Sequence, residues 1–445
     1  MRRLFLTLLL VVCTVPLRGQ TATPPLQVPY TQFRLANGLT VVLHQDKSVP
    51  VVTVNVWYHV GSANEKPGRT GFAHLFEHLM FEGSKNVKEG VFDTLLESAG
   101  GNNNGSTNND RTNYFEDVPS NALELALYLE SDRMAYLLDT MTPQRVDGQR
   151  DVVKNERRQS YENQPYGMAS IEIDKMLWPA NHPYNWPTIG YMEDLTAASQ
   201  SDVVEFFKKY YVPNNASLVI AGDIDIPRTK ALVEKWFNEI PRGAEVEPIA
   251  PPAAILTGVQ KKTLTDRVSL PRLYLAWLSP RLYAPGDAAL DIVSSVLTGG
   301  KNSRLYKRLV YETQMAQDVT AFQQSGAIGS EFQIIATARR GHTAAELQKV
   351  IDEELEKLRR DPPDAREVQR AINQVEASFY RRMERVSNKA DSLNGYYVAG
   401  GGPDYFAEDL ARYTSLSPSD VQAAAIRWLP ADRRVELVVE PEVKK

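Results

Sequence analysis

The sequence repeats one pattern in its two halves, and this repeat constrains the fold more than any other feature. Residues 199–223 read SQSDVVEFFKKYYVPNNASLVIAGD, and residues 417–441 read SPSDVQAAAIRWLPADRRVELVVEP. Each copy predicts a capped helix, a turn at a proline and a closing strand. A repeat of this length indicates a duplicated domain rather than a solenoid of short units. We therefore expect two homologous domains.

The limits of these domains follow from length and composition. A chain of 445 residues is too long for one typical core. The proline-rich stretch EVEPIAPPAAI lies between the two copies and is typical of a linker. We predict an N-terminal domain over residues 25–244, a linker over 245–256 and a C-terminal domain over 257–441. Strand-type and helix-type segments mix without strict βαβ alternation, so each domain is expected to be α+β, with a largely antiparallel sheet packed with helices.

The first residues have the layout of a secretory signal peptide. Two arginines are followed by an apolar run from Leu4 to Val15 and then by Pro16, and the run is too short for a comfortable membrane span. We predict a signal peptide over residues 1–20 and a secreted or periplasmic protein. Cys13 is the only cysteine, so the mature chain would have no disulfide or thiol chemistry. The net charge of −5, with no long basic run, gives no indication of nucleic-acid binding.

The segment FAHLFEHLMFEGSK, residues 72–85, is the strongest indication of chemistry. On a helix, His74 and His78 are four residues apart and lie on one face, with Glu77 beside them. A catalytic zinc site uses three protein ligands and a water, whose pKa falls to about 7, and a nearby carboxylate can take its proton. The order H-x-x-E-H is that of the inverted zincin motif. The alternative is two helical histidines with ordinary polar roles, but burying them unpartnered among apolar residues would be costly.

A third ligand must come from another element. None of the other histidines lies in a comparable setting: His44, His59, His182 and His342. A carboxylate on the predicted helix at residues 143–163 is the better candidate. Asp151, Glu156 and Glu162 all remain possible by chemistry, because spacing alone cannot choose among them.

The chain resembles the insulinase/pitrilysin type of zinc metallopeptidase. The most specific feature is HLFEH followed, after 77 intervening residues, by Glu156 in RDVVKNE. Further segments support the resemblance over nearly the whole mature chain: NNNGSTNNDRTNYF, HPYNWPTIG, YYVPNNASLVIAGD and LTGGKNSRLYKRLV. The resemblance implies that His74, His78 and Glu156 bind one zinc ion per chain and that Glu77 is the general base. It also implies that the two domains form half of a clamshell chamber.

The family also suggests where a substrate binds. The segment NNNGST matches the family's strand whose edge pairs with a bound peptide, and the matching positions are Asn104, Gly105, Ser106 and Thr107. Backbone pairing of this kind holds an extended peptide without demanding one sequence, and a glycine allows close approach. The alternative is a flexible polar loop, which Asn/Gly runs often form.

The second half departs from the family pattern. Members that act alone or as homodimers carry an Arg and a Tyr, seven residues apart, which hold the substrate carbonyl; here these positions are Val310 and Gln317. The chain therefore resembles the zinc-bearing subunit of the bacterial two-chain type, and we expect a homologous partner chain to supply the pair in a heterodimer. A homodimer that uses Arg308 or Tyr311 is the alternative. Many relatives also have a glutamate where this chain has Gln149.

Together these features predict a zinc-dependent endopeptidase that cleaves peptides or unfolded segments. One alternative is a non-catalytic structural or assembly subunit on the same fold. A second is a metal- or peptide-binding protein without turnover, which the loss of the Arg/Tyr pair would favour.

Overall fold

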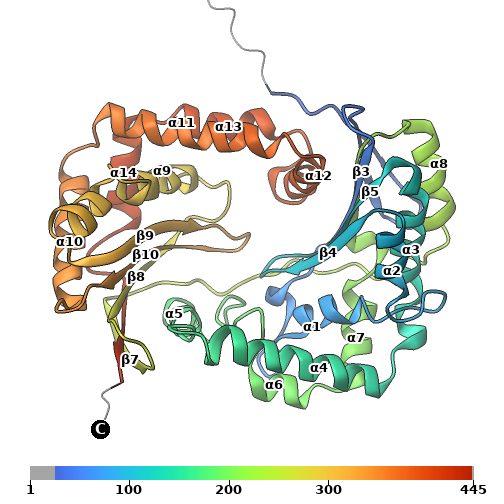
Figure 1. Cartoon of the computed structure of the whole chain (residues 1–445), viewed down its shortest axis with the longest axis horizontal. Helices are drawn as coiled ribbons and strands as arrows, with labels where there is room; N and C mark the ends of the chain where they lie inside the picture. The colour runs from blue at the N-terminus through green and yellow to red at the C-terminus, as the bar shows by residue number, and fades with distance from the viewer. Residues whose placement is uncertain (1–25, 443–445) are drawn as a thin grey trace, which may run out of the picture.

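The computed structural model describes residues 26–442 as two sheets with their helices, joined by an extended segment (Figure 1). In the view of Figure 1 the first sheet lies on the right and the second on the left. The predicted signal peptide and Cys13 lie outside the described residues. Within residues 26–442, no helix is both long enough and apolar enough to cross a membrane.

The first sheet has the strand order β1-β2-β6-β3-β5-β4. Its strands are β1 (Thr31–Arg34), β2 (Thr40–Gln45), β3 (Val51–Tyr58), β4 (Asn102–Thr107), β5 (Thr112–Pro119) and β6 (Ala216–Gly222). The strands β1 and β2 form the hairpin that the Asn-Gly signal predicts, with Gly38 at φ 95° in the turn. Only β2 and β6 are parallel, so the sheet is largely antiparallel.

The second sheet repeats this topology with the order β7-β11-β8-β10-β9. Its strands are β7 (Gln260–Asp266), β8 (Arg272–Ser279), β9 (Ala316–Gln324), β10 (Ser330–Ala338) and β11 (Val435–Pro441). Again one pair, β7 and β11, is parallel. The order matches β2-β6-β3-β5-β4 of the first sheet strand for strand, which is the duplication that the sequence repeat predicts. The predicted linker lies in a stretch without helix or strand between Phe237 and Gln260.

Most helices cover one face of the sheet in their own half and bury its apolar side chains, but α5 (Ala169–Leu177) and α12 (Val386–Gly395) pack on the sheet of the other half. The helices of each half are as follows. In the first half these are α1 (Phe72–Leu79), α2 (Val91–Ser98), α3 (Leu123–Tyr136), α4 (Pro143–Arg157), α5 (Ala169–Leu177), α6 (Met192–Ala197), α7 (Gln200–Tyr210) and α8 (Ile226–Phe237). In the second half they are α9 (Asp287–Thr298), α10 (Ala344–Arg360), α11 (Ala365–Arg382), α12 (Val386–Gly395), α13 (Phe406–Thr414) and α14 (Pro418–Trp428). The repeated capping boxes begin α7 at Ser199 and α14 at Ser417.

Helix α12 comes from the second half of the sequence but packs on the first sheet. Its residues Ala390 and Leu393 share a buried apolar cluster with Val42 and Val219, on the face of the sheet opposite the main core. Asn394 accepts a hydrogen bond from the Ser217 hydroxyl (2.7 Å). The two halves are therefore fastened together across the first sheet as well as through the linker.

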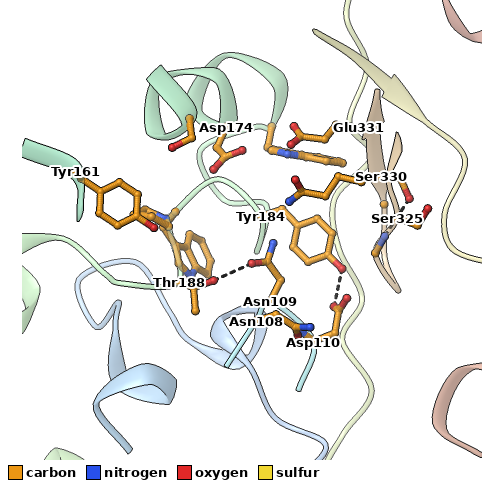
Figure 2. Close-up of a pocket in the computed structure, with 17 residues that line it drawn as sticks. Asn108, Asn109, Asp110, Tyr161, Asp174, Tyr184, Thr188, Ser325, Ser330 and Glu331 are labelled. Atoms are coloured by element: carbon orange, nitrogen blue, oxygen red, sulfur yellow. Dashed lines mark hydrogen bonds between the residues drawn. The ribbon is translucent and has the colours of Figure 1, made fainter. Parts of the chain in front are cut away.

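The halves also meet beside a cavity of about 300 Å³ (Figure 2). The Asp110 carboxylate, in the loop between β4 and β5, accepts a hydrogen bond from the hydroxyl of Tyr184 and another from the backbone N–H of Ala327 (3.0 Å). Because Ala327 lies in the turn between β9 and β10, the second of these bonds connects the edges of the two sheets.

Candidate metal centre

Helix α1 places His74, Glu77 and His78 on a surface that is not buried in the core. Its other face is apolar and fully buried: Phe72, Leu75, Phe76 and Leu79. The helix begins after Gly71, whose φ of 87° turns the chain into the first helical turn. The buried Glu65 carboxylate accepts hydrogen bonds from the backbone N–H groups of Gly71 (2.9 Å) and Ala73 (2.8 Å), and so fixes this end of α1.

Helix α4 brings the third candidate ligand against α1. It begins with Thr142, whose side chain accepts a hydrogen bond from the Arg145 N–H, and it is anchored by Val146 and Val153, which are buried. Glu156 comes in the last turn of α4. The C-terminal end of α4 therefore lies beside the histidines of α1.

The three side chains converge on one point. Glu156 Oε2 lies 3.3 Å from Nε2 of His78 and 3.7 Å from Nε2 of His74. One ligand atom from each residue lies within 4.8 Å of the other two, and no other three His, Cys, Asp or Glu side chains among residues 26–442 do so. Of the rival carboxylates, Asp151 lies near Lys154 (3.8 Å) and Glu162 near Arg157 (3.2 Å). The geometry thus selects Glu156 from the three carboxylates that the sequence left open.

The chemistry of this group fits zinc. Two imidazole nitrogens and one carboxylate oxygen are a known ligand set of catalytic zinc sites, which keep a fourth position for water. Burial, with the neighbouring His78, lowers the pKa of His74 to about 4, so His74 is a neutral imidazole at neutral pH. The hydrogen bond from His78 holds the pKa of Glu156 below its usual value. A neutral imidazole and an ionised carboxylate are the forms that bind a metal ion.

On this same surface of α1, Glu77 lies beside the histidines and approaches strand β4. Burial raises its pKa, although a hydrogen bond with Thr107 opposes the rise. A Cβ added to Gly105 would lie 3.2 Å from Cγ of Glu77, so the glycine lets β4 approach Glu77 without a tight side-chain contact. A carboxylate with a raised pKa next to the metal ligands is suited to general-base chemistry.

The predicted substrate-binding residues lie on a strand rather than in a loop. Strand β4 ends the first sheet and, among residues 26–442, pairs only with β5, so its other edge is free of described strands. Arg111 stiffens it: Nη1 donates to the backbone oxygen (2.8 Å) and to the hydroxyl oxygen (2.7 Å) of Ser106. The positions Asn104 to Thr107 therefore form a free strand edge that passes directly beside Glu77.

Comparison with known proteins identifies the family. Residues 40–173 match the family described as "Insulinase (Peptidase family M16)", and residues 197–375 match "Peptidase M16 inactive domain". Zinc protease PqqE of Helicobacter pylori is 30% identical over 450 residues, which cover 98% of this chain and 97% of that protein. The chain belongs to the M16 family. The candidate ligands all lie within the first matched region, in agreement with the description of the second as inactive.

Solved structures confirm the predicted two-domain fold of this M16 protein. The crystal structure of a protease from Helicobacter pylori has a TM-score of 0.87 and 28% identity, and the match covers 94% of this chain and 100% of that chain. The first half of the periplasmic protease PqqL from Escherichia coli has a TM-score of 0.75 at 18% identity and covers 92% of this chain. The complete PqqL is about twice as long, since the match then covers only 48% of it. One chain of the present length therefore corresponds to about half of that chain.

In this M16 protein, the second-half residues at the positions of the family's Arg/Tyr pair do not form a comparable pair. Val310 lies in a helical turn (Tyr306–Glu312) and packs against the core of the second half. Gln317 is exposed on the edge strand β9. Arg308 is paired with Glu353 and Glu354 of α10.

Two residues near the site, Glu65 and Glu82, were not predicted from the sequence. Glu65 lies in the loop before α1, and nothing in the local pattern marks it as the group that fixes the helix. Glu82, just after α1, bonds to Gln149 of α4. The only available signal for Glu82 was its position four residues after His78, which places both on one side of a helical segment.

Proposed function

We propose that the protein is a zinc-dependent endopeptidase. The observation that carries this proposal is the convergence of His74, His78 and Glu156 next to Glu77 and a free strand edge. A zinc ion held by the three ligands would supply Lewis-acid activation of a water molecule and of the peptide carbonyl. The name "zinc protease" of the H. pylori relative supports the same reaction class.

Glu77 is the proposed general base. Its raised pKa brings it closer to neutral pH, where a carboxylate can accept a proton from the attacking water and then donate it to the leaving amine. Burial beside β4 keeps its carboxylate close to a peptide bound along that strand.

The substrate is an extended chain. A peptide that adds to the free edge of β4 is held by backbone hydrogen bonds, with Asn104, Gly105, Ser106 and Thr107 along the contact. Peptides and unfolded chains present such extended segments most readily, so we propose them as the substrate class.

The partner is proposed to be a homologous chain in a heterodimer that encloses a chamber. Val310 and Gln317 cannot hold a carbonyl oxygen as an Arg/Tyr pair does, and the ion pairs of Arg308 occupy it on α10. A missing oxyanion donor typically costs about 10²- to 10³-fold in rate, so a partner that supplies the pair would restore much of the activity. We also propose that the protein is exported to the periplasm or secreted, because its first 20 residues have the layout of a signal peptide.

The test measures zinc content and hydrolysis of a mixed quenched-peptide library by the purified mature chain. The chain is assayed alone and with a homologue that carries the Arg/Tyr pair. We expect one zinc ion per chain and strong activity only in the mixture. Full activity of the chain alone would refute the heterodimer but not the peptidase. Absence of zinc would favour the structural-subunit alternative.

Glu77→Gln is the matched variant for this assay. It keeps the shape of the side chain and all three metal ligands, so we expect normal zinc content and a loss of hydrolysis. If the variant cleaved the library at the wild-type rate, another group would have to be the base.

A further inference from the structure

The turn between β4 and β5 ends the proposed substrate edge, and the first half holds this turn in place. The backbone N–H of Asn108 donates to the carbonyl oxygen of Arg111 (3.0 Å), which closes the turn. The carbonyl oxygens of Asn108 and Asn109 accept hydrogen bonds from the backbone N–H groups of Ser62 (3.2 Å) and Ala63 (2.8 Å). The position of this turn therefore fixes where β4 ends.

Asp110 connects this turn to the second half. Its carboxylate accepts a hydrogen bond from the hydroxyl of Tyr184 and another from the backbone N–H of Ala327 (3.0 Å) (Figure 2). The Tyr184 hydroxyl oxygen accepts a further hydrogen bond from the backbone N–H of Ile328 (3.3 Å). A charged acceptor forms stronger hydrogen bonds than a neutral one. Asp110 and Tyr184 together therefore hold the turn between β9 and β10, residues 325–329, against the end of β4.

Two glycines let the β9–β10 turn lie directly on the first half. A Cβ added to Gly326 would lie 2.6 Å from the hydroxyl oxygen of Tyr184, and one added to Gly329 would lie 2.7 Å from the ring of Trp178. Both distances are shorter than a side-chain carbon can adopt without a shift of its neighbours. Glycine at these positions permits this close approach, so the sequence of the second half is fitted to the contact with Tyr184 and Trp178.

The connected turn belongs to the strand that the proposed peptide would join. Strand β4 approaches Glu77 at Gly105 and ends shortly before Asp110. A peptide held by backbone pairing needs this edge in one place, because hydrogen bonds weaken steeply as their geometry is lost. We propose that Asp110 is a positioning residue through which the second half holds the free edge of β4 in place for the peptide. The inference rests on the proposed peptidase function and gives the second half a part in substrate binding.

The first measurement is hydrogen exchange of the backbone amides of residues 102–111 in the mature, zinc-loaded chain. Gly326→Ala displaces the β9–β10 turn and leaves Asp110 and the metal ligands unchanged. We expect exchange in this segment to become roughly 10-fold faster, as the loss of a hydrogen bond to a charged group would permit. Gly402→Ala is the matched control in the same half, because a Cβ added to Gly402 meets no atom within 4 Å, and it should exchange like the wild type.

The second measurement is the kinetics of peptide hydrolysis in the mixture with the homologue that carries the Arg/Tyr pair. Asp110→Ala and Gly326→Ala should each raise KM by roughly 10-fold, with kcat within about 2-fold of the wild type and the zinc content unchanged. Weaker backbone pairing removes binding that the substrate and the transition state share, so KM changes and kcat does not. Because both substitutions break one contact, the double variant should raise KM no further than either single variant.

The inference is overturned if Gly326→Ala leaves both the exchange of residues 102–111 and KM at their wild-type values, or if Gly402→Ala changes them equally. Additive effects of the two substitutions on KM would also overturn it. A fall in kcat and zinc content together with the rise in KM would show a general structural role and would have the same consequence. A wild-type mixture without any hydrolysis would instead refute the proposed function, so the two failures are distinct.

Discussion

Replacing Glu331 by glutamine tests the electrostatics of the contact between the two halves. Glu331 on β10 and Asp174 on α5 are carboxyl groups from different halves that line the same cavity, shown together in Figure 2. No lysine or arginine is among the residues lining this cavity in the described part of the chain. Burial raises the pKa of Glu331 to about 7, although a hydrogen bond from Gln333 (2.8 Å) opposes the rise. Burial, with the charge of Glu331, also raises the pKa of Asp174.

The sign of the effect follows from proton binding. The carboxyl of Glu331 titrates near 4.5 when unfolded and near 7 when folded, so the folded state binds more protons between these values. Stability should therefore fall as pH rises through this window. This difference in pKa between the two states contributes about 3 kcal/mol to the free energy of unfolding, at roughly 1.4 kcal/mol for each pKa unit. Glutamine is neutral at every pH and removes this contribution, while it keeps the size of the side chain.

The assay is urea unfolding of the mature chain at about pH 5 and about pH 8, which bracket most of the window. We expect wild-type stability to fall more steeply than that of Glu331→Gln, by about 2 kcal/mol over this range. The double variant with Asp174→Asn should be flatter still. Glu356→Gln, whose wild-type side chain is 67% exposed, is the control and should follow the wild type. Equal pH dependence of Glu331→Gln and wild type would refute the reasoning.

Two further substitutions test the site and the core. Gly105→Val should crowd Glu77 and lower kcat/KM by about 100-fold, because small displacements of catalytic groups have effects of this size. Peptide hydrolysis measures this loss, and metal analysis should show an unchanged zinc content. Arg133→Met should destabilise the first half by about 3 to 5 kcal/mol in urea unfolding. The guanidinium lies buried between the carboxylates of Glu116 and Glu130, which the variant would leave without a counter-charge.

The sequence predicted the structure best where all residues of a pattern lie in one short continuous segment. The spacing of His74, Glu77 and His78 on one helix predicted their common surface, and the repeated helix–turn–strand segment predicted two sheets of the same topology. Both are local periodicities, which helices and strands convert directly into shared faces. From the residues alone, Glu156 could not be distinguished from Asp151 and Glu162 as the third ligand, because the distinction depends on how α4 packs against α1.

Contacts between residues that are far apart in the sequence could not be predicted from it. The packing of α12 on the first sheet includes a hydrogen bond between Asn394 and Ser217, which lie 177 residues apart. The bond between Glu82 and Gln149 spans 67 residues, and either residue alone looks like an ordinary polar residue of a helical segment. Such pairs are set by the tertiary arrangement, so only the structure could reveal them.

Helix α1 divides the site into two parts that can be tested separately. Its histidines face α4, where Glu156 completes the metal ligands, and Glu77 faces β4, where the peptide is proposed to bind. Changes on the α4 side should therefore alter zinc affinity first, and changes on the β4 side should alter turnover at full zinc occupancy. Because one short helix carries both sets of residues, a change at its N-terminal anchor, Glu65, should impair zinc affinity and turnover together.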